Sequence, residues 1–289
     1  MKKGLVMEGG AMRGMFTCGI LDVFMENGIE FDGAIGTSAG ATFGCNLKSR
    51  QIGRPARYNK NYCSNWRYGS MKSWFLTGDV FEPEFCYHTI PYELDPWDAK
   101  TFAENPMEFY CVCTDAKTAR PIYHKLKDGG EEDIQWIRGS ASIPVMCKPV
   151  FLGKRQLLDG GIVDPIALAY FQSIGYERNV VIETQPRNFV KKPQKGLGFI
   201  RLALHNYPAV AEALSRRHDL YNDEKAYIRS QEACGNVYVI RPEIALNISS
   251  TETDPAELER VYQEGRRMGL KTLEEVKVFL EENGNESIS

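Results

Sequence analysis

The sequence predicts an α/β fold with a mainly parallel central sheet flanked by helices and a helical extension at the C-terminus. Short apolar runs alternate with helical patterns through most of the first 185 residues, as they do where crossover helices join parallel strands. Two glycine-rich turns near the N-terminus each follow an apolar run, and beyond residue 196 the pattern is mostly helical. The 289 residues therefore suit one large α/β domain with a smaller extension.

The expected elements follow the apolar periodicity. Strands are predicted at 5–7, 34–35, 109–114, 121–125, 156–159, 180–184 and 237–241. Helices are predicted at 15–26, 41–48, 165–175, most of 196–235, and 255–282. The last helix is expected to start with Asp254 as its N-cap and Pro255 in its first position. We expect this helix to pack on the main body rather than bind a partner. We place a core at 3–185 and, at 186–289, a helical extension with one further strand.

Composition and charge exclude several classes of protein. The 35 basic and 38 acidic side chains give a net charge of -3, so nucleic acid is not an expected partner. The apolar run Gly4–Met7 is too short for a signal peptide, and no run of about 18 apolar residues exists to span a bilayer, so we expect a cytoplasmic protein. The eight cysteines lack the paired spacing of zinc sites, so we expect no metal and no cofactor.

The two glycine-rich turns suit acyl transfer. Gly36-Thr37-Ser38-Ala39-Gly40 matches G-x-S-x-G, in which the serine sits on a sharp strand-to-helix turn with its hydroxyl exposed. Gly9-Gly10-Ala11-Met12-Arg13-Gly14 presents backbone N–H groups at the start of a helix, where they can hold a negative charge that forms during reaction. We therefore predict Ser38 as nucleophile and Gly9, Gly10, Ala11 and Arg13 as the oxyanion hole.

A serine needs a base, and the histidines are poor candidates for it. None of the four lies in the glycine- or acid-flanked loop expected of a catalytic histidine; they are His88, His124, His205 and His218. Asp159-Gly160-Gly161, at the end of a predicted strand, is the better candidate. A desolvated aspartate bonded to the serine can act as general base directly, although its ordinary pKa makes it a weak one.

At this point the sequence resembles the patatin-like phospholipases, a family of lipid acyl hydrolases. The resemblance covers roughly residues 3–185 and rests on three motifs in order: 8–14, 36–40 and 159–161, with 140–144 and 149–150 similar to the stretch before the family's aspartate. It implies a three-layer sandwich and a catalytic dyad in which Ser38 attacks an ester and Asp159 takes its proton, as in a phospholipase A-type esterase. Two departures are Ala11, where the family usually has a glycine, and Asp164, where an asparagine is common.

The substrate side of the site is less defined. Residues 62–97 hold ten aromatic side chains, which suit an acyl-chain pocket, a lid at a lipid interface, or a satellite core beneath a long connection. Lys191, Lys192 and Lys195 suit either anionic headgroups or a solvated loop. A lipid or ester substrate is expected, with transient contact to the inner face of a membrane; the oligomeric state is left open.

Three other functions are alternatives to a lipid hydrolase. A dinucleotide-binding turn needs G-x-G-x-x-G, but Ala11 takes the place of its middle glycine, and that function gives Ser38 and Asp159 no role. A non-catalytic lipid-binding protein on the same fold stays open, and so does an esterase or thioesterase of a small soluble substrate.

Overall fold

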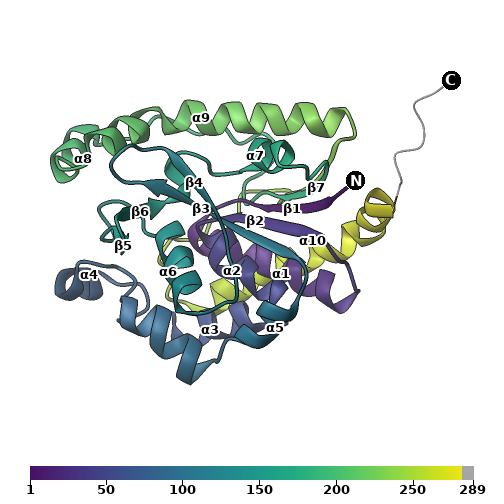
Figure 1. Ribbon diagram of the computed structural model, residues 1–289, viewed down its shortest axis with the longest axis horizontal. Helices are drawn as coiled ribbons and strands as arrows, with labels where there is room; N and C mark the ends of the chain where they lie inside the picture. Colours follow the sequence, from purple (N-terminus) through teal and green to yellow (C-terminus); the bar gives the residue numbers. More distant parts are fainter. Residues whose placement is uncertain (282–289) are drawn as a thin grey trace.

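Eight strands form one mixed sheet in the computed structural model, which describes residues 1–281 (Figure 1). The strand order is β5-β6-β3-β2-β1-β7-β8, and β4 pairs with β3. The strands are β1 (Lys3–Met7), β2 (Gly33–Thr37), β3 (Glu108–Asp115), β4 (Pro121–Lys125), β5 (Val150–Leu152), β6 (Arg155–Asp159), β7 (Arg178–Ile182) and β8 (Val237–Ile240). All seven predicted strands are present. The three-residue β5 was not predicted, because so short a run cannot show the alternation of apolar and polar residues that marks a strand.

The centre of the sheet is parallel and one end is antiparallel. β3, β2, β1, β7 and β8 pair in parallel, whereas β4 and β6 run antiparallel to β3, and β5 antiparallel to β6. In β1, Leu5 and Met7 pack into the core on one face of the sheet, while Val6 packs into the core on the other. Helices therefore cover both faces, as expected of a three-layer α/β fold.

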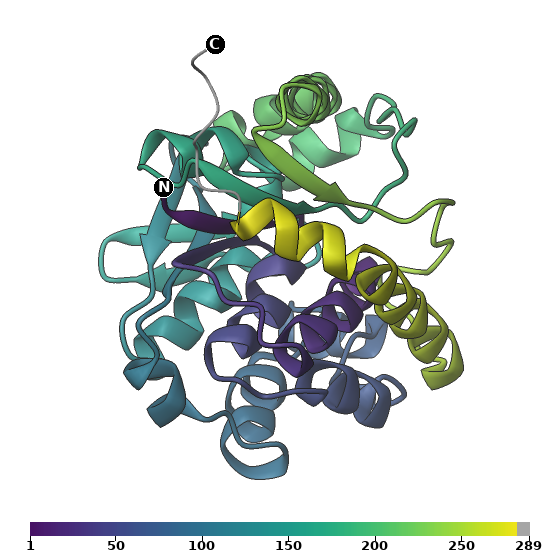
Figure 2. The same cartoon turned by 90° about the vertical axis from the view of Figure 1, so that its right-hand side faces the viewer.

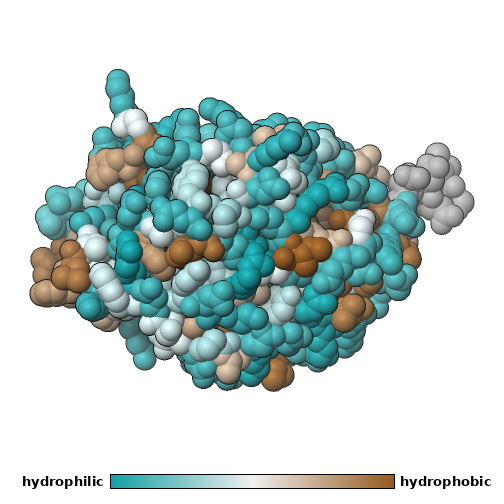
Figure 3. All heavy atoms as spheres, turned by 90° about the horizontal axis from the view of Figure 1, so that it is seen from below, coloured by the Kyte–Doolittle hydropathy of each residue, from teal (hydrophilic) through white to brown (hydrophobic). Residues whose placement is uncertain are grey.

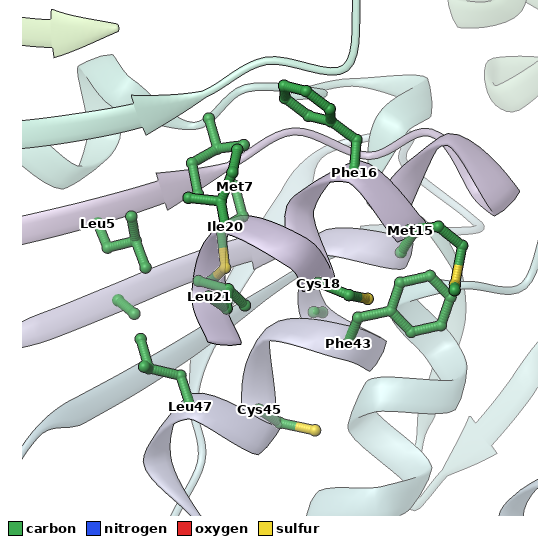
Figure 4. Close-up of a cluster of buried hydrophobic side chains, with 14 of the residues drawn as sticks. Leu5, Met7, Met15, Phe16, Cys18, Ile20, Leu21, Phe43, Cys45 and Leu47 are labelled. Atoms are coloured by element: carbon green, nitrogen blue, oxygen red, sulfur yellow. The ribbon is translucent and has the colours of Figure 1, made fainter. Parts of the chain in front are cut away.

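The helices divide between these two faces. Apolar side chains of α1, α2, α3 and α10 belong to the same core cluster as Leu5 and Met7, and those of α7 and α9 to the same cluster as Val6. Figure 1 shows the placement of the helices, and Figure 4 shows the side chains of α1 and α2 beside Leu5 and Met7. The helices are α1 (Gly14–Glu26), α2 (Ala39–Lys48), α3 (Arg54–Tyr62), α4 (Met71–Thr77), α5 (Ala99–Glu104), α6 (Glu131–Ser140), α7 (Leu168–Ser173), α8 (Leu197–Ala203), α9 (Pro208–Ala233) and α10 (Pro255–Glu281), with short 3-10 turns at Ala11–Arg13 and Gly160–Ile162 and a π-helix at Phe85–Leu94. Within these residues, no helix combines the length and apolarity needed to cross a bilayer.

The last helix packs on the main body, as predicted, and lies along α1 (Figure 2). A Cβ on Gly265 would lie 2.0 Å from the carbonyl oxygen of Phe16, and one on Gly19 2.2 Å from that of Tyr262, so the two backbones approach closely only because both residues are glycine. The carboxylate of Asp254 accepts the Ala256 N–H at 2.8 Å, which confirms the predicted cap. Residue 282 of the predicted helix and the end of the extension lie outside the described residues, and the 185/186 boundary stays a prediction.

Candidate active site

Ser38 sits on a strained turn between β2 and α2. Its backbone has φ 55° and ψ -119°, a conformation that a residue with a side chain rarely adopts. The neighbouring glycines permit the turn, because a Cβ on Gly36 would lie 2.3 Å from the Gly40 carbonyl oxygen and one on Gly40 2.4 Å from that of Met7. The Ser38 carbonyl accepts the amides of Ala41 and Thr42, both at 3.0 Å, so the serine starts the helix.

A buried serine on α6 holds this turn in place. The Ser38 N–H donates to Ser140 Oγ at 2.9 Å, and the Ser140 hydroxyl donates to the Val112 carbonyl at 2.6 Å. Ser140 is fully buried. Sequence reasoning gave it no role, although it lies in the 140–144 stretch that contributed to the family resemblance.

The register of β3 brings Asp159 to Ser38. Thr37, the last residue of β2, lies opposite Val112, and Asp159, the last residue of β6, lies opposite the next β3 residue, Cys113. β2 and β6 both pair with the same edge of β3, because β4 occupies its opposite edge. Since β2 runs parallel and β6 antiparallel to β3, the carboxyl ends of β2 and β6 face each other. The Ser38 hydroxyl donates to Asp159 Oδ2 at 2.6 Å. β6, which ends at Asp159, runs antiparallel to β3, so the aspartate follows an antiparallel strand of the mainly parallel sheet.

Asp159 is held from several directions. Its Oδ1 accepts the Gly161 N–H at 2.7 Å, and its carbonyl accepts the Thr114 hydroxyl at 2.8 Å. Burial raises the pKa of this carboxyl, while the Ser38 hydroxyl, the Arg217 guanidinium and the Gly161 amide partly offset that rise. The carboxylate is therefore a stronger base than an aspartate in water. Arg217, from α9, also donates to the Gly161 carbonyl, and no sequence motif pointed to it.

The glycine-rich loop lies beside Ser38, since a Cβ on Gly9 would lie 3.1 Å from the Ser38 Cβ. The N–H groups of Gly9 and Arg13 donate to the carbonyls of Pro165, at 3.3 Å, and Gly10, at 3.1 Å. Those of Gly10, Ala11 and Met12 have no acceptor within residues 1–281. Ala11 adopts φ 48°, so alanine takes the left-handed conformation that glycine would take at lower cost. Of the four predicted oxyanion-hole residues, Gly10 and Ala11 have the available amides.

A buried glutamate ties this loop to the rest of the fold. Glu8 accepts the Thr184 N–H at 2.5 Å and the Tyr221 hydroxyl at 2.7 Å, which links β1 to the end of β7 and to α9. Burial raises the pKa of this carboxyl. The Arg13 side chain turns to Thr184, with 3.4 Å between Nε and Oγ1, and so lies against the loop. Helix α9 thus supports both the loop and the aspartate turn.

Asp164 belongs to a second buried acid site rather than to the Ser38–Asp159 pair. It accepts the Tyr123 hydroxyl at 2.6 Å and is joined by a hydrogen bond to Glu224 of α9. Burial raises the pKa of both carboxyls, and the hydrogen bond between them needs one proton, which the pair holds. Glu224 also accepts the Ile166 N–H at 3.1 Å. The departure at Asp164 therefore fastens α9 to the loop after Asp159.

An apolar cavity of about 110 Å³ opens beside Ser38. Ala11, Met12 and Ser38 line one part of it, and Tyr68, Phe81, Tyr87 and Trp97 of the aromatic segment line another. Tyr68 and Phe85 are also buried in the core beneath this segment. The aromatic segment therefore extends the main core and walls the cavity, and the satellite core that the sequence left open as an alternative is not separate from that core.

The histidines take no part in the arrangement. His124 lies in β4 and stacks on Trp136, His218 lies on α9, His88 lies in the π-helix, and His205 follows α8. Ser38 Oγ has Asp159 as its hydrogen-bond partner. Over residues 1–281, no group of three or more His, Cys, Asp or Glu side chains is placed to hold a metal ion.

The chain is similar to several known proteins. Lysophospholipase nte1 of Aspergillus fumigatus is 30% identical over 177 residues, 60% of this chain and 11% of that protein. Lysophospholipase NTE1 of Coccidioides immitis is 25% identical over 299 residues, 95% of this chain and 18% of that protein. The chain thus spans between about a tenth and a fifth of the length of these relatives. Among solved structures, VipD from Legionella pneumophila aligns with a TM-score of 0.45 and 14% identity, covering 95% of this chain and 67% of that one.

Two family models match the chain. Residues 207–281, which include α9 and α10, match a domain of unknown function (DUF6363). Residues 5–171, which include Ser38, Asp159 and the glycine-rich loop, match the model of the patatin-like phospholipases. Since this match covers more than half of the chain, the chain belongs to the patatin-like phospholipase family.

Proposed function

We propose that this protein is a serine acyl hydrolase that cleaves ester bonds of lipids through a Ser38–Asp159 dyad. The observation that carries the proposal is the 2.6 Å hydrogen bond from Ser38 Oγ to Asp159 Oδ2, beside an apolar cavity and a loop with unused amides. A buried carboxylate bonded to a serine hydroxyl on a strained turn is the arrangement that proton abstraction needs.

In the first step, Asp159 accepts the hydroxyl proton as Ser38 Oγ attacks the ester carbonyl carbon. The carbonyl π electrons move to oxygen, and the amides of Gly10 and Ala11 donate to that oxyanion. Such donors, fixed before reaction, are worth about 10²–10³ in rate each. The tetrahedral intermediate then collapses, the bond to the alcohol breaks, and the proton on Asp159 passes to the departing oxygen. An acyl-enzyme on Ser38 remains.

In the second step, Asp159 takes a proton from water, and the resulting hydroxide oxygen attacks the acyl carbon. The second tetrahedral intermediate releases the fatty acid, and the proton returns from Asp159 to Ser38 Oγ. Only one carboxylate is needed, since it acts as base and then as acid in each half of the reaction. The raised pKa of Asp159 suits both roles.

The cavity beside Ser38 supports an apolar acyl group as substrate. Aromatic and aliphatic side chains line most of it, so an acyl chain would replace water there at little polar cost. The relatives named lysophospholipases agree with a phospholipase A-type reaction. The cytoplasmic location expected from the sequence stays a prediction, which cell fractionation can test.

A substrate profile with matched variants tests the proposal. Wild-type protein should release fatty acid from a lysophospholipid and label with a fluorophosphonate probe. Ser38→Ala and Asp159→Asn should abolish fatty-acid release while keeping a cooperative thermal transition, and Ser173→Ala, an exposed serine on α7, should behave as wild type. Unlabelled wild-type protein would point to a lipid-binding protein, and turnover of short esters alone to a small soluble substrate; either result contradicts the proposal.

A further inference from the structure

Two short helices at one end of the sheet expose large apolar side chains. On α4, Met71, Phe75 and Leu76 are 69%, 84% and 61% exposed; on α8, Phe199 and Leu202 are 67% and 73% exposed. α8 buries none of its residues, and α4 buries only Ser73. Side chains of this kind normally lie inside a protein, so their exposure on two neighbouring helices points to a contact outside the chain.

These side chains share one end of the molecule. A single surface hollow is lined by α4, by residues 145–149 and by the end of α8. Phe151, which is 64% exposed, belongs to the edge strand β5 between the two helices (Figure 1). In Figure 3, apolar atoms gather at the left-hand edge, where α4 lies. We call α4, residues 148–156 and residues 192–203 the basic apolar end.

The charge of this end is one-sided. Its three segments hold seven basic residues and no acidic residue: Lys72, Lys148, Lys154, Arg155, Lys192, Lys195 and Arg201. Arg201 lies 3.7 Å from Glu212 of α9, and the Lys148 amide donates to the buried carboxylate of Asp79. The other five have no acidic side chain within 4.0 Å among the described residues. Since the whole chain has a net charge of -3, the positive charge is concentrated here.

The basic apolar end also adjoins the candidate active site. Two carbonyls of the loop after α6 accept hydrogen bonds. The Ser142 carbonyl accepts the Asp159 N–H at 2.8 Å. The Val145 carbonyl accepts the indole N–H of Trp74, on α4, also at 2.8 Å. One short segment therefore touches both the dyad aspartate and α4. A surface held against α4 would lie next to the site.

We propose that the basic apolar end docks this protein on a lipid surface that carries anionic headgroups. Aromatic and aliphatic side chains enter the boundary between headgroups and acyl chains, and the surrounding lysines and arginines attract the negative surface. A second copy of the chain is a poorer occupant, because seven like charges would face each other across the contact. The proposal goes beyond the hydrolase function and holds whether or not Ser38 reacts.

Vesicle sedimentation with Ser38→Ala protein tests the proposal without any hydrolysis. The protein should bind vesicles that mix phosphatidylcholine with phosphatidylglycerol, bind pure phosphatidylcholine far more weakly, and leave the mixed vesicles as salt is raised. Changing Phe75 and Leu202 together to serine should weaken binding by on the order of tenfold or more. The matched control changes Ile244 and Leu270, which are 75% and 55% exposed elsewhere on the chain, to serine and should bind unchanged.

A second pair of variants tests the charge. Changing Lys154, Lys192 and Lys195 together to glutamine should weaken binding by about fivefold per lysine and reduce its salt dependence. Lys100→Gln, an exposed lysine on α5, should have no effect. Absent binding to mixed vesicles, equal losses in the control variants, or a dimer in sedimentation that Phe75→Ser dissociates would each overturn the proposal.

Discussion

Replacing Ser140 with alanine should damage both the stability and the activity of this protein. The substitution removes the hydroxyl that accepts the Ser38 N–H and donates to the Val112 carbonyl, and Ser140 is fully buried. An unsatisfied buried amide costs about 1–3 kcal/mol. The free energy of unfolding should fall by that amount, and the strained turn at Ser38 should lose the contact that fixes its amide.

Urea unfolding and ester hydrolysis measure the two effects. We expect a lower denaturation midpoint with an unchanged m-value, and a kcat at least about tenfold below wild type, since small displacements of a nucleophile are costly. Ser173→Ala, whose exposed hydroxyl donates within α7, is the control and should change neither quantity. A Ser140→Ala protein with wild-type midpoint and kcat would refute the reasoning that this hydroxyl positions the nucleophile.

Three other substitutions test separate parts of the structure. Glu224→Gln keeps a hydrogen-bond donor toward Asp164 but has no proton to lose. In the wild type, the contribution of protonated Glu224 to the free energy of unfolding is complete below the ordinary pKa of this carboxyl and is lost as pH rises through its raised pKa. The melting temperature of the variant should therefore fall less than that of the wild type toward alkaline pH, and an identical decline would contradict this. Gly265→Ala should lower the free energy of unfolding by on the order of 1–3 kcal/mol, because its Cβ would meet the backbone of α1. Gly198→Ala, with open space around the new Cβ, should leave that free energy unchanged. Denaturation curves measure both variants, and equal losses of stability would contradict the prediction. Ala11→Val should reduce kcat/KM by about tenfold or more because a β-branched residue resists a positive φ, whereas Ala11→Gly should retain activity in the same assay.

The sequence predicted the parts of this fold that depend on residues close together in the chain. The turn around Ser38 and the turn at Asp159 both follow apolar strands and contain glycines where the backbone needs them, so their positions were readable. The cap at Asp254 was readable for the same reason. That Ser38 and Asp159 meet was expected from the family resemblance, and the β3 register supplies the physical cause.

Contacts between distant segments could not be predicted in this way. β6 runs antiparallel to β3, and no pattern within the five residues of β6 encodes that direction. Ser140, Arg217 and Glu224 act through single side chains, and no local pattern indicates which distant group each of them contacts. The amides of Gly9 and Arg13 are occupied by carbonyls that only the folded loop brings near.

The most direct test of the account is the pH dependence of kcat/KM for ester hydrolysis in wild-type and Asp159→Asn protein. If Asp159 is the base, wild-type kcat/KM should rise with pH through the raised pKa of that carboxyl and then level off. The variant should lose this rise and about 10²–10⁴ in rate, while replacement of His218 should leave the profile intact. An Asp159→Asn protein that keeps the wild-type profile within tenfold would contradict the dyad.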